Sequence, residues 1–423
     1  MTEISLREAL PQSLPFQTGR ATSHPESREM RSSAKDSLDL ATVTDLAGFQ
    51  ALESDWNALF ERSGSSHQFF QTFNWLWHWC RVYLPDPDGD GGCRLSIVTG
   101  RQNGRLVLCW PLVIERKLGL RCLEWMGLPV SQYGDVLLDD DPASGDWLEE
   151  SWRYVQSELG ADLISLASVR LDGAVAPVTQ RYPDAVVRRR LALARDLSHL
   201  ADCETFEQGL SSRGRANRRR QRRRLAEMGE ITFTIHREGE EALAVTDRAL
   251  ALKRLWLRSR GLLSKAFMDR RFDLFFASVA GAGERATGCH VSDLSVGGRL
   301  AAAEVGFRCK GRHYGHVLAY DNAFVRFAPG TLQIEGTMRD CVDQGQICFD
   351  LQAPTDTYKR NWADTECEDS DYAIALSVAG SIFNRCISRG LFPLAKWTLT
   401  RLPRPVRQAL ARIALSGDAR VGR

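Results

Sequence analysis

The chain contains one order of secondary-structure elements twice, and this repeat restricts its fold more than any other feature. In each half, an aromatic-rich helix-like segment precedes three strand-like runs joined by short turns, and a helix-like run and a short strand-like run follow. The pattern repeats although the letters differ, so it predicts two copies of one α/β unit. The segments are 70–83, 93–99, 106–114, 120–125, 144–159 and 162–168 in the first half, and 272–279, 289–296, 300–308, 312–320, 329–344 and 347–352 in the second.

Length and composition agree with two or three domains. The 423 residues are 43% apolar, and a net charge of +2 favours no class of partner. The eleven cysteines are scattered without a Cys-x-x-Cys pair, so we expect reduced core thiols of a cytosolic protein and neither a disulfide framework nor a metal site. Residues 1–37 lack periodic apolarity and a signal-peptide core, and should form a leader without a fold. No later segment is apolar over the ~20 residues of a membrane span.

A Pro-Gly pair opens the helix-like run 329–344. Proline in a first turn gives up an N–H that has no helical partner anyway, and Gly330 would let a ligand approach the backbone closely. Free N–H groups and the helix dipole favour anions at such a position, so residues 328–332 could cradle a pyrophosphate. The alternative is an ordinary helix start, because many Pro-Gly pairs bind nothing.

Eight of the twelve residues 213–224 are arginine, and Gly229 should end the helix that contains them. Arginine binds carboxylates and phosphates through a bidentate fork, so one interpretation is a docking face for an acidic glycan, an anionic membrane or RNA. The other is a solvated linking helix paired with acidic residues of either domain. No RNA-binding fold or aromatic platform accompanies the arginines, and no DNA partner is expected.

Several short motifs occur in an order that resembles the GNAT-like acyltransferases related to the CelD and BcsL cellulose-biosynthesis proteins. The resemblance spans about residues 40–375 and depends on the order of the motifs rather than on any one of them. The motifs are Trp56-Asn57-Ala58-Leu59-Phe60, Phe69-Phe70-Gln71-Thr72, Gln132-Tyr133-Gly134-Asp135, the arginine-rich helix, residues 318–321, Ala328-Pro329-Gly330, Phe349-Asp350-Leu351 and residues 358–362.

The resemblance implies an α/β fold of tandem GNAT-like (acyl-CoA N-acyltransferase) domains, with mixed sheets flanked by helices. The donor would be acetyl-CoA or another acyl-CoA, held by the second domain, and no metal is implied. The implied parts are an N-terminal domain at 38–196, an arginine-rich linking helix at 197–230, a donor-binding domain at 231–375 and a basic amphipathic helical tail at 376–423. The implied donor-binding residues are Ala328, Gly330, Thr331, Leu332 and Lys359.

The first repeat has residues 142–145 in the place of the Pro-Gly helix start, and no Tyr-Lys pair follows its last strand. It therefore looks like a scaffold or an acceptor-binding half. The chain departs from the family at one point: Gln352 stands where a glycine usually follows the Phe-Asp-hydrophobic strand. This departure affects the loop on the acceptor side more than the donor site.

An acyl transfer needs a base for the acceptor and a proton donor for the leaving thiolate. By similarity to GNAT enzymes, Tyr358 is the expected proton donor, and its alternative role is an aromatic residue that caps the sheet. Asp350 could be the base, or could hold Lys359 or Arg360 in a structural ion pair. Glu304 lies within an apolar strand and is the other candidate base, unless it lies on the solvated side of the sheet.

Acceptor contacts are expected from five residues, although core packing is the better explanation for the tryptophan-rich helix among them. Two histidines, His313 and His316, are three positions apart on a strand. They should point to opposite faces and cannot chelate one metal together. The expected substrate-binding residues are Gln71, Trp75, Tyr133, Asp135 and Tyr320.

The run 391–415 mixes apolar and basic residues, and prolines break it into short pieces. It could lie on an anionic membrane or pack against the second domain. We expect a cytoplasmic protein, peripheral at the inner face of the membrane or bound to a polysaccharide synthase.

Three functions stay open. The first is an acyl-CoA-dependent N- or O-acyltransferase with an amine- or hydroxyl-bearing acceptor, such as an amino sugar or glycan intermediate of exopolysaccharide, cellulose or cell-envelope synthesis. The second is a Fem-like transferase, which shares the tandem fold but takes aminoacyl-tRNA as donor. The third is a non-catalytic module of a polysaccharide-synthesis assembly.

Overall fold

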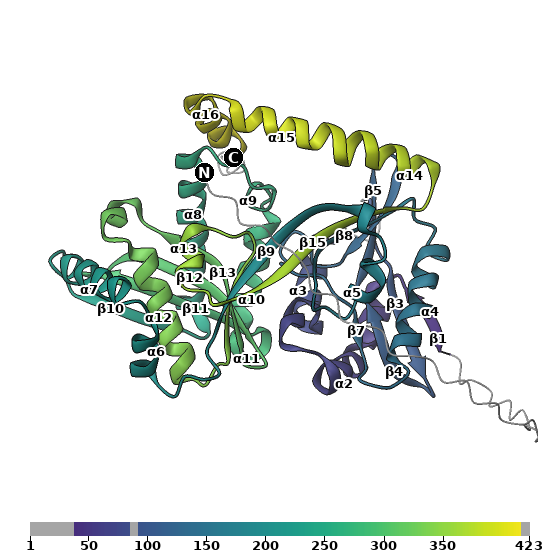
Figure 1. Ribbon diagram of the computed structural model, residues 1–423, viewed down its shortest axis with the longest axis horizontal. Coiled ribbons are helices and arrows are strands. Elements are labelled where there is room, and N and C mark those ends of the chain that lie inside the picture. Colours follow the sequence, from purple (N-terminus) through teal and green to yellow (C-terminus); the bar gives the residue numbers. More distant parts are fainter. Residues whose placement is uncertain (1–37, 85–91, 416–423) are drawn as a thin grey trace, which may run out of the picture. The chain divides into compact units, whose positions relative to one another are not determined.

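The computed structural model describes residues 38–84 and 92–415, and the predicted leader at 1–37 lies outside the described residues. The described chain has two sheets flanked by helices (Figure 1). A four-stranded antiparallel sheet has the order β1-β3-β4-β7, and an eleven-stranded mixed sheet has the order β10-β11-β12-β13-β14-β9-β15-β8-β6-β5-β2. The strands are β1 (Asp39–Val43), β2 (Cys93–Leu95), β3 (Ile97–Gln102), β4 (Arg105–Trp110), β5 (Leu112–Lys117), β6 (Leu120–Trp125), β7 (Leu137–Leu138), β8 (Leu163–Arg170), β9 (Val186–Asp196), β10 (Ile231–His236), β11 (Cys289–Val296), β12 (Arg299–Cys309), β13 (Arg312–Tyr320), β14 (Cys348–Gln352) and β15 (Thr365–Ala375).

The helices range from single turns to the long α8. They are α1 (Leu46–Ala51), α2 (Glu53–Ser63), α3 (Phe73–Tyr83), α4 (Ser144–Ser157), α5 (Ala176–Thr179), α6 (Cys203–Gly209), α7 (Ser212–Ala226), α8 (Gly239–Arg260), α9 (Lys265–Met268), α10 (Arg271–Ala282), α11 (Glu284–Thr287), α12 (Pro329–Asp343), α13 (Thr357–Arg360), α14 (Val378–Phe383), α15 (Phe392–Arg401) and α16 (Arg404–Ala414). A 3-10 turn, η3 (Asn322–Phe327), precedes α12. No helix of the described ranges is long and apolar enough to cross a membrane.

The second meander forms as predicted, with two-residue turns joining β11, β12 and β13. Both central residues of each turn have a positive φ: 56° and 76° at Gly297 and Gly298, and 44° and 76° at Lys310 and Gly311. Positive φ at both positions is the backbone of a type I′ turn, whose twist matches that of antiparallel strands. The helix and strand predicted next are α12 and β14.

The first meander differs from the prediction, because the run 106–114 forms two strands. β4 ends at Trp110 and pairs in the small sheet, whereas β5 begins at Leu112 and pairs in the large sheet. Pro111 between them has no N–H to donate to a ladder, so the chain leaves one sheet there and enters the other. The run 93–99 divides in the same way, into β2 and β3.

The two halves are joined by a long antiparallel ribbon of β9 and β15, which was not predicted (Figure 1). Charge pairs across the ribbon hold it in register: Arg190 lies 2.7 Å from Asp369, and Arg189 lies 2.7 Å from Glu368. Such opposite-charge pairs stabilise neighbouring strands. β9 also pairs with β14 and β15 with β8, so the large sheet runs through both halves.

Helices cover both faces of the second half of the large sheet. α8 and α10 pack over one face, and α12 packs over the other (Figure 1). α3 of the first half packs against α10, where the ring of Trp75 lies 4.7 Å from that of Phe275 and 4.9 Å from that of Phe307. The two halves therefore share one hydrophobic core. All eleven cysteines are free, as expected for reduced thiols.

Candidate functional site

The predicted donor site lies where β13 and β14 separate. The two strands run parallel and pair over only three residues each, ending at Tyr314 and Asp350. Beyond this point β13 continues to Tyr320, while β14 ends at Gln352. Residues 315–320 of β13 therefore do not pair with β14 within the described chain.

One lysine ammonium reaches the separated part of each strand. Nζ of Lys253, from α8, donates to the carbonyl oxygen of Leu318 on β13 at 3.1 Å. Nζ of Lys359, from α13, donates to the carbonyl oxygen of Gln352 on β14 at 3.0 Å. Burial lowers the pKa of both lysines, that of Lys359 to about 8, although the Asp356 carboxylate acts in the opposite direction. Two desolvated cations thus lie at the strand separation.

Lys253 was missed by the sequence analysis, although a signal for it exists. α8 buries Ala249, Leu250 and Leu257, and Lys253 is three or four positions from each of them on the same face. A lysine in the middle of an apolar stripe is unusual, because lysine is almost never buried without a partner. Here the partner is the Leu318 carbonyl group.

Two non-glycine residues with left-handed backbone flank the separation. Ala328, immediately before α12, has φ 51°, and Gln352, at the end of β14, has φ 61°. This region favours glycine, and a residue with a Cβ pays roughly 1–2 kcal/mol to occupy it. The structure therefore explains the departure noted at Gln352: the position has the backbone of a glycine. Such backbone strain concentrates at functional sites. The positive φ angles of Ala328 and Gln352 therefore support a functional site at the strand separation.

α12 begins at Pro329, as predicted, but the N–H groups of Thr331 and Leu332 are not free, because both return to the Ala328 carbonyl. The hydrogen bond from the Thr331 N–H is 3.0 Å long. Gly330 is buried, and a Cβ there would lie 3.3 Å from the ring of Tyr320. Leu332 is buried in the core below. The expected donor residues thus stand together at the helix start, with Tyr320 beside them.

Tyr320 is held from the opposite side by α8. Its hydroxyl accepts a hydrogen bond from Nε1 of Trp256 at 3.0 Å. Trp256 also lies under the Lys253 ammonium, 4.9 Å from the ring centroid. Trp256 and Lys253 therefore belong to the same group as Tyr320, and neither was predicted.

Glu304 is buried and does not lie on a solvated side of the sheet, so that alternative is wrong. Only 1% of its surface is exposed, and Oε1 lies 2.7 Å from Nε2 of His313. Burial raises the pKa of Glu304 to about 7, and burial with nearby His290 and Arg308 lowers that of His313 well below its ordinary value. A carboxyl group with a pKa near neutrality has the property that a general base requires.

The two histidines of β13 lie on opposite faces, as predicted. His313 contacts Glu304 and the ring of Phe349, whereas His316 lies among the rings of Trp75 and Phe276. Burial lowers the pKa of His316 to about 3, so this imidazole is neutral.

Tyr358 lies one residue before Lys359 and keeps 40% of its surface exposed. Partial burial raises the pKa of its phenol, and the carboxylates of Asp356 and Glu304 add to the shift. Tyr358 and Glu304 are therefore within electrostatic range of each other. The structure brings the two candidates to one region without a hydrogen bond between them.

Asp350 is a structural residue in this arrangement. Its carboxylate accepts hydrogen bonds from Tyr133 at 3.0 Å, Arg312 at 3.1 Å and the Gln352 N–H at 2.8 Å, and Arg170 lies 3.9 Å away. The ion-pair partners are arginines of β13 and β8, and not Lys359 or Arg360 as expected. The expectation failed because pairing of β13, β14 and β9 determines which residues meet.

Four predicted acceptor-binding residues form no exposed platform. Trp75 and Tyr133 lie in the shared core, and Gln71 donates to the Tyr133 carbonyl at 3.0 Å. Asp135 is buried and accepts the N–H groups of residues 174 and 175. All four are at most 3% exposed, and the core-packing explanation therefore fits Trp75, for which it was given. Tyr133 contacts β14 through its hydrogen bond to Asp350.

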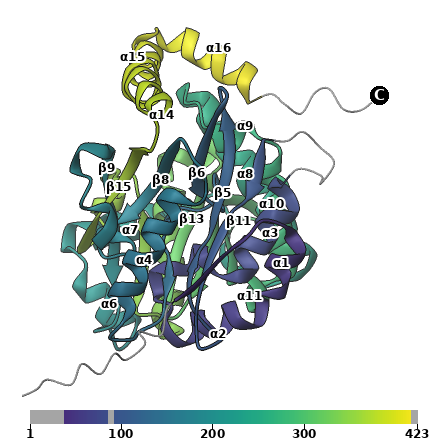
Figure 2. The ribbon, with the colours of Figure 1, turned by 90° about the vertical axis from the view of Figure 1, so that its right-hand side faces the viewer.

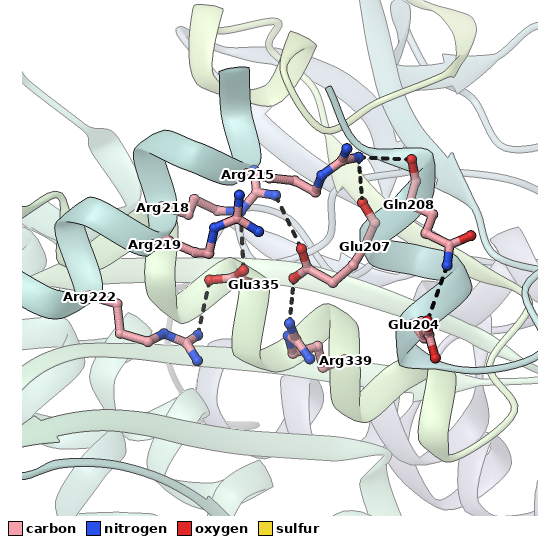
Figure 3. A pocket seen from close by; sticks show the side chains of 9 residues that line it. All are labelled: Glu204, Glu207, Gln208, Arg215, Arg218, Arg219, Arg222, Glu335 and Arg339. Atoms are coloured by element: carbon pink, nitrogen blue, oxygen red, sulfur yellow. Dashed lines mark hydrogen bonds and ion pairs between the residues drawn. The ribbon is translucent and has the colours of Figure 1, made fainter. Parts of the chain in front are cut away.

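The arginine-rich helix α7 lies beside α12 and α6, with a cavity of about 390 Å³ between them (Figure 3). Glu335 of α12 stands between two of its arginines, 3.1 Å from Nε of Arg218 and 3.0 Å from Arg222. These two arginines therefore pair with an acidic residue, as the linking-helix interpretation expected, although Arg218 is buried and not solvated. The cavity borders the middle of α12 and not its first turn.

The tail divides into a packed and an exposed part (Figure 2). α16 packs against α8 and buries Ala411 and Leu415. On α15, Leu394 and Trp397 are exposed, the latter by 49%. The expected packing against the second half is thus present for α16, whereas the membrane contact stays a prediction.

The chain is similar to one family model and to several solved structures of low sequence identity. A family model described as an acetyltransferase (GNAT) domain matches residues 212–360. The structure of FemX is similar at 10% identity, covering 83% of this chain and 100% of that one, with a TM-score of 0.53. A tandem GNAT protein from the clavulanic acid biosynthesis pathway aligns at 12% identity, covering 80% and 99%, with a TM-score of 0.41. A conserved protein of unknown function from Bacteroides thetaiotaomicron aligns at 12% identity, covering 76% and 97%, with a TM-score of 0.45.

A comparison with curated proteins gives no match. The predicted fold class is confirmed in that the chain is an α/β protein with mixed sheets flanked by helices, of which residues 212–360 match a GNAT domain. The fold and the matched domain are those of GNAT-type acyltransferases.

Proposed function

We propose that the protein is an acyl-CoA-dependent N- or O-acyltransferase whose donor enters between β13 and β14. The observation that carries the proposal is the separation of these strands directly beside the start of α12. Residues 315–320 of β13 lie beyond the ladder with β14 and would offer main-chain hydrogen bonds to an extended chain such as pantetheine, except at the Leu318 carbonyl, which Lys253 contacts. The N–H groups of Thr331 and Leu332 return to the Ala328 carbonyl, so the Gly330 N–H and the positive end of the helix dipole would be what α12 offers to a pyrophosphate. Ala328, Gly330, Thr331 and Leu332 would hold the phosphates, and Lys359 would lie near the acyl end.

In the proposed reaction, an amine or hydroxyl of the acceptor attacks the thioester carbonyl, the new C–N or C–O bond forms, and the C–S bond breaks. The acceptor loses one proton, and the thiolate gains one. Glu304 is the candidate for accepting the first proton because its pKa of about 7 lies near neutrality, with His313 as its hydrogen-bond partner. Tyr358 is the candidate for donating the second. Asp350 has no part in this scheme, because its oxygens are engaged by Tyr133, Arg312 and Gln352.

We propose the segment 231–375 as the donor-binding domain and 38–196 as a scaffold or acceptor-side domain, linked through 197–230 and followed by the tail from 376. The acceptor we propose is an amine- or hydroxyl-bearing intermediate of exopolysaccharide, cellulose or cell-envelope synthesis. Leu394 and Trp397 are exposed, and residues 378–415 of the tail include seven basic and no acidic residues. These features fit a peripheral position on an anionic membrane.

Titration of the protein with CoA by calorimetry tests the donor. Thr331→Glu should abolish binding, because it places a carboxylate against the pyrophosphate, yet an acidic residue in a first turn stabilises a helix. Gly330→Glu should also abolish CoA binding. It is the riskier variant for folding, because its Cβ would lie 3.3 Å from the ring of Tyr320. Gly145→Glu is the matched control, since it stands in the corresponding place of the first half with open space around it.

Unchanged CoA affinity in folded Thr331→Glu would overturn the placement of the donor. Binding of an aminoacyl-tRNA without binding of CoA would favour the Fem-like alternative. Binding of neither would favour a non-catalytic module.

A further inference from the structure

We propose that the cavity between α6, α7 and α12 binds the phosphate group of a small phosphorylated molecule. The cavity holds about 390 Å³, which is within the ordinary range for small-molecule sites and larger than a phosphate alone requires. Figure 3 shows its charged side chains converging from the three helices. The residues that line it with positive charge are Arg215, Arg218, Arg219, Arg222 and Arg339.

The cavity has an excess of positive charge. Its carboxylates are Glu204, Glu207 and Glu335, so the five arginines leave an excess of two positive charges when all three acids are ionised. Burial raises the pKa of Glu335, and the adjacent Glu207 adds to this shift against the effect of the two arginines that contact Glu335. An anion is therefore the ligand that the cavity favours.

Three of the arginines have donor groups that no carboxylate uses. Arg219 is exposed and has no hydrogen bond or ion pair in the part of the chain that the structure describes. Arg215 donates to main-chain carbonyl groups of residues 207, 208 and 210, so its charge is not neutralised. The side chain of Arg218 is only 9% exposed, and its Nη2 is buried without a hydrogen bond, 3.9 Å from Glu207.

Phosphate is the anion that suits this arrangement. Guanidinium groups bind phosphate oxygens through paired N–H donors, and a dianion can engage several of them at once. The phosphate can come from two sources. One is the 3′-phosphate of CoA, which rests on the proposed function, and the other is a separate phosphorylated metabolite.

Two charge-neutralising variants of α7 test the proposal. Arg219→Gln removes a cavity cation that has no structural contact, and Arg220→Gln removes the next arginine, which is exposed, bonds Asn217 and does not line the cavity. We expect Arg219→Gln to bind inorganic phosphate or CoA about tenfold more weakly than the wild type, and Arg220→Gln to bind them nearly as tightly. Calorimetry and the shift of the melting temperature with inorganic phosphate provide the measurements.

A third probe, dephospho-CoA, identifies the source. If Arg219→Gln weakens binding of CoA but not of dephospho-CoA, the cavity binds the 3′-phosphate of the donor. If it weakens binding of inorganic phosphate alone, the ligand is another phosphorylated molecule. If Arg219→Gln and Arg220→Gln bind all three probes with equal affinity, the proposed phosphate site is wrong. This conclusion would stand even if CoA binds and so supports the proposed donor. Failure of CoA to bind would contradict the proposed function while the inorganic phosphate measurement still decides this site.

Discussion

Nε2 of His313 lies 2.7 Å from Oε1 of Glu304, and both side chains are almost completely buried. Burial raises the pKa of Glu304 to about 7 and lowers that of His313 far below its ordinary value. Both groups therefore favour their neutral forms in the folded protein. The stability of the protein should depend on pH through this pair.

We expect Glu304→Gln to cost less stability at pH 8 than at pH 5. The folded state holds the Glu304 proton more tightly than the unfolded state, so this carboxyl lowers the free energy of unfolding as pH rises from about 4.5 to about 7. Glutamine has no such penalty, and the difference between the two pH values should be on the order of 3 kcal/mol. Urea unfolding of both proteins measures it. A difference that does not change with pH would contradict a raised pKa.

Lys359→Met should stabilise the protein at pH 7. The folded-state pKa of about 8 lies below the ordinary 10.5, so the cost of burying the ammonium is fully present below pH 8 and disappears as pH approaches 10.5. We expect a gain of about 1–2 kcal/mol, because losing the bond to the Gln352 carbonyl offsets part of the relief. The gain should vanish near pH 10.

Thermal melts at several pH values give this measurement, and Arg360→Met, a change at the exposed neighbouring position, is the control. A loss of stability at pH 7 would mean that Lys359 has a stabilising anionic partner.

Tyr358→Phe should lower kcat by ~10² to 10⁴ and leave CoA affinity close to wild type, if the phenol protonates the leaving thiolate. Phenylalanine keeps the ring that a sheet-capping role requires, so a packing role predicts no change in rate. Steady-state kinetics with acetyl-CoA and an accepted amine decide between them, after a melting curve shows that the variant is folded. A rate within about threefold of wild type, roughly 0.7 kcal/mol in the barrier, would remove Tyr358 from the mechanism.

Arg218→Leu should destabilise the protein by about 2–4 kcal/mol, because it breaks a buried ion pair with Glu335 and removes the guanidinium that lies 5.0 Å from the ring of Trp362. Arg223→Leu, on the exposed side of the same helix, should change the free energy of unfolding by no more than about 0.5 kcal/mol. Urea denaturation compares them. Equal effects would contradict the division of α7 into a packed and a solvent-exposed face.

Local sequence signals determined the elements and their order. The turns Gly297-Gly298 and Lys310-Gly311 predict tight hairpins from local sequence, because glycine readily adopts the positive φ that such turns require. The Pro-Gly pair specified the start of α12 for an equally local reason. The same patterns supported the prediction of a tandem fold. They also identified Glu304, Tyr358 and Lys359 as candidate site residues of the second half.

The tertiary structure alone decided which of these residues meet. Lys253 reaches β13 from α8, and Asp350 meets Tyr133 across more than two hundred residues of sequence. Nothing in the local pattern showed that β9 and β15 would join both halves in one sheet. Backbone conformation follows from the few residues around each turn. Burial, ion pairing and pKa shifts depend instead on strand order and helix packing, which bring distant segments together.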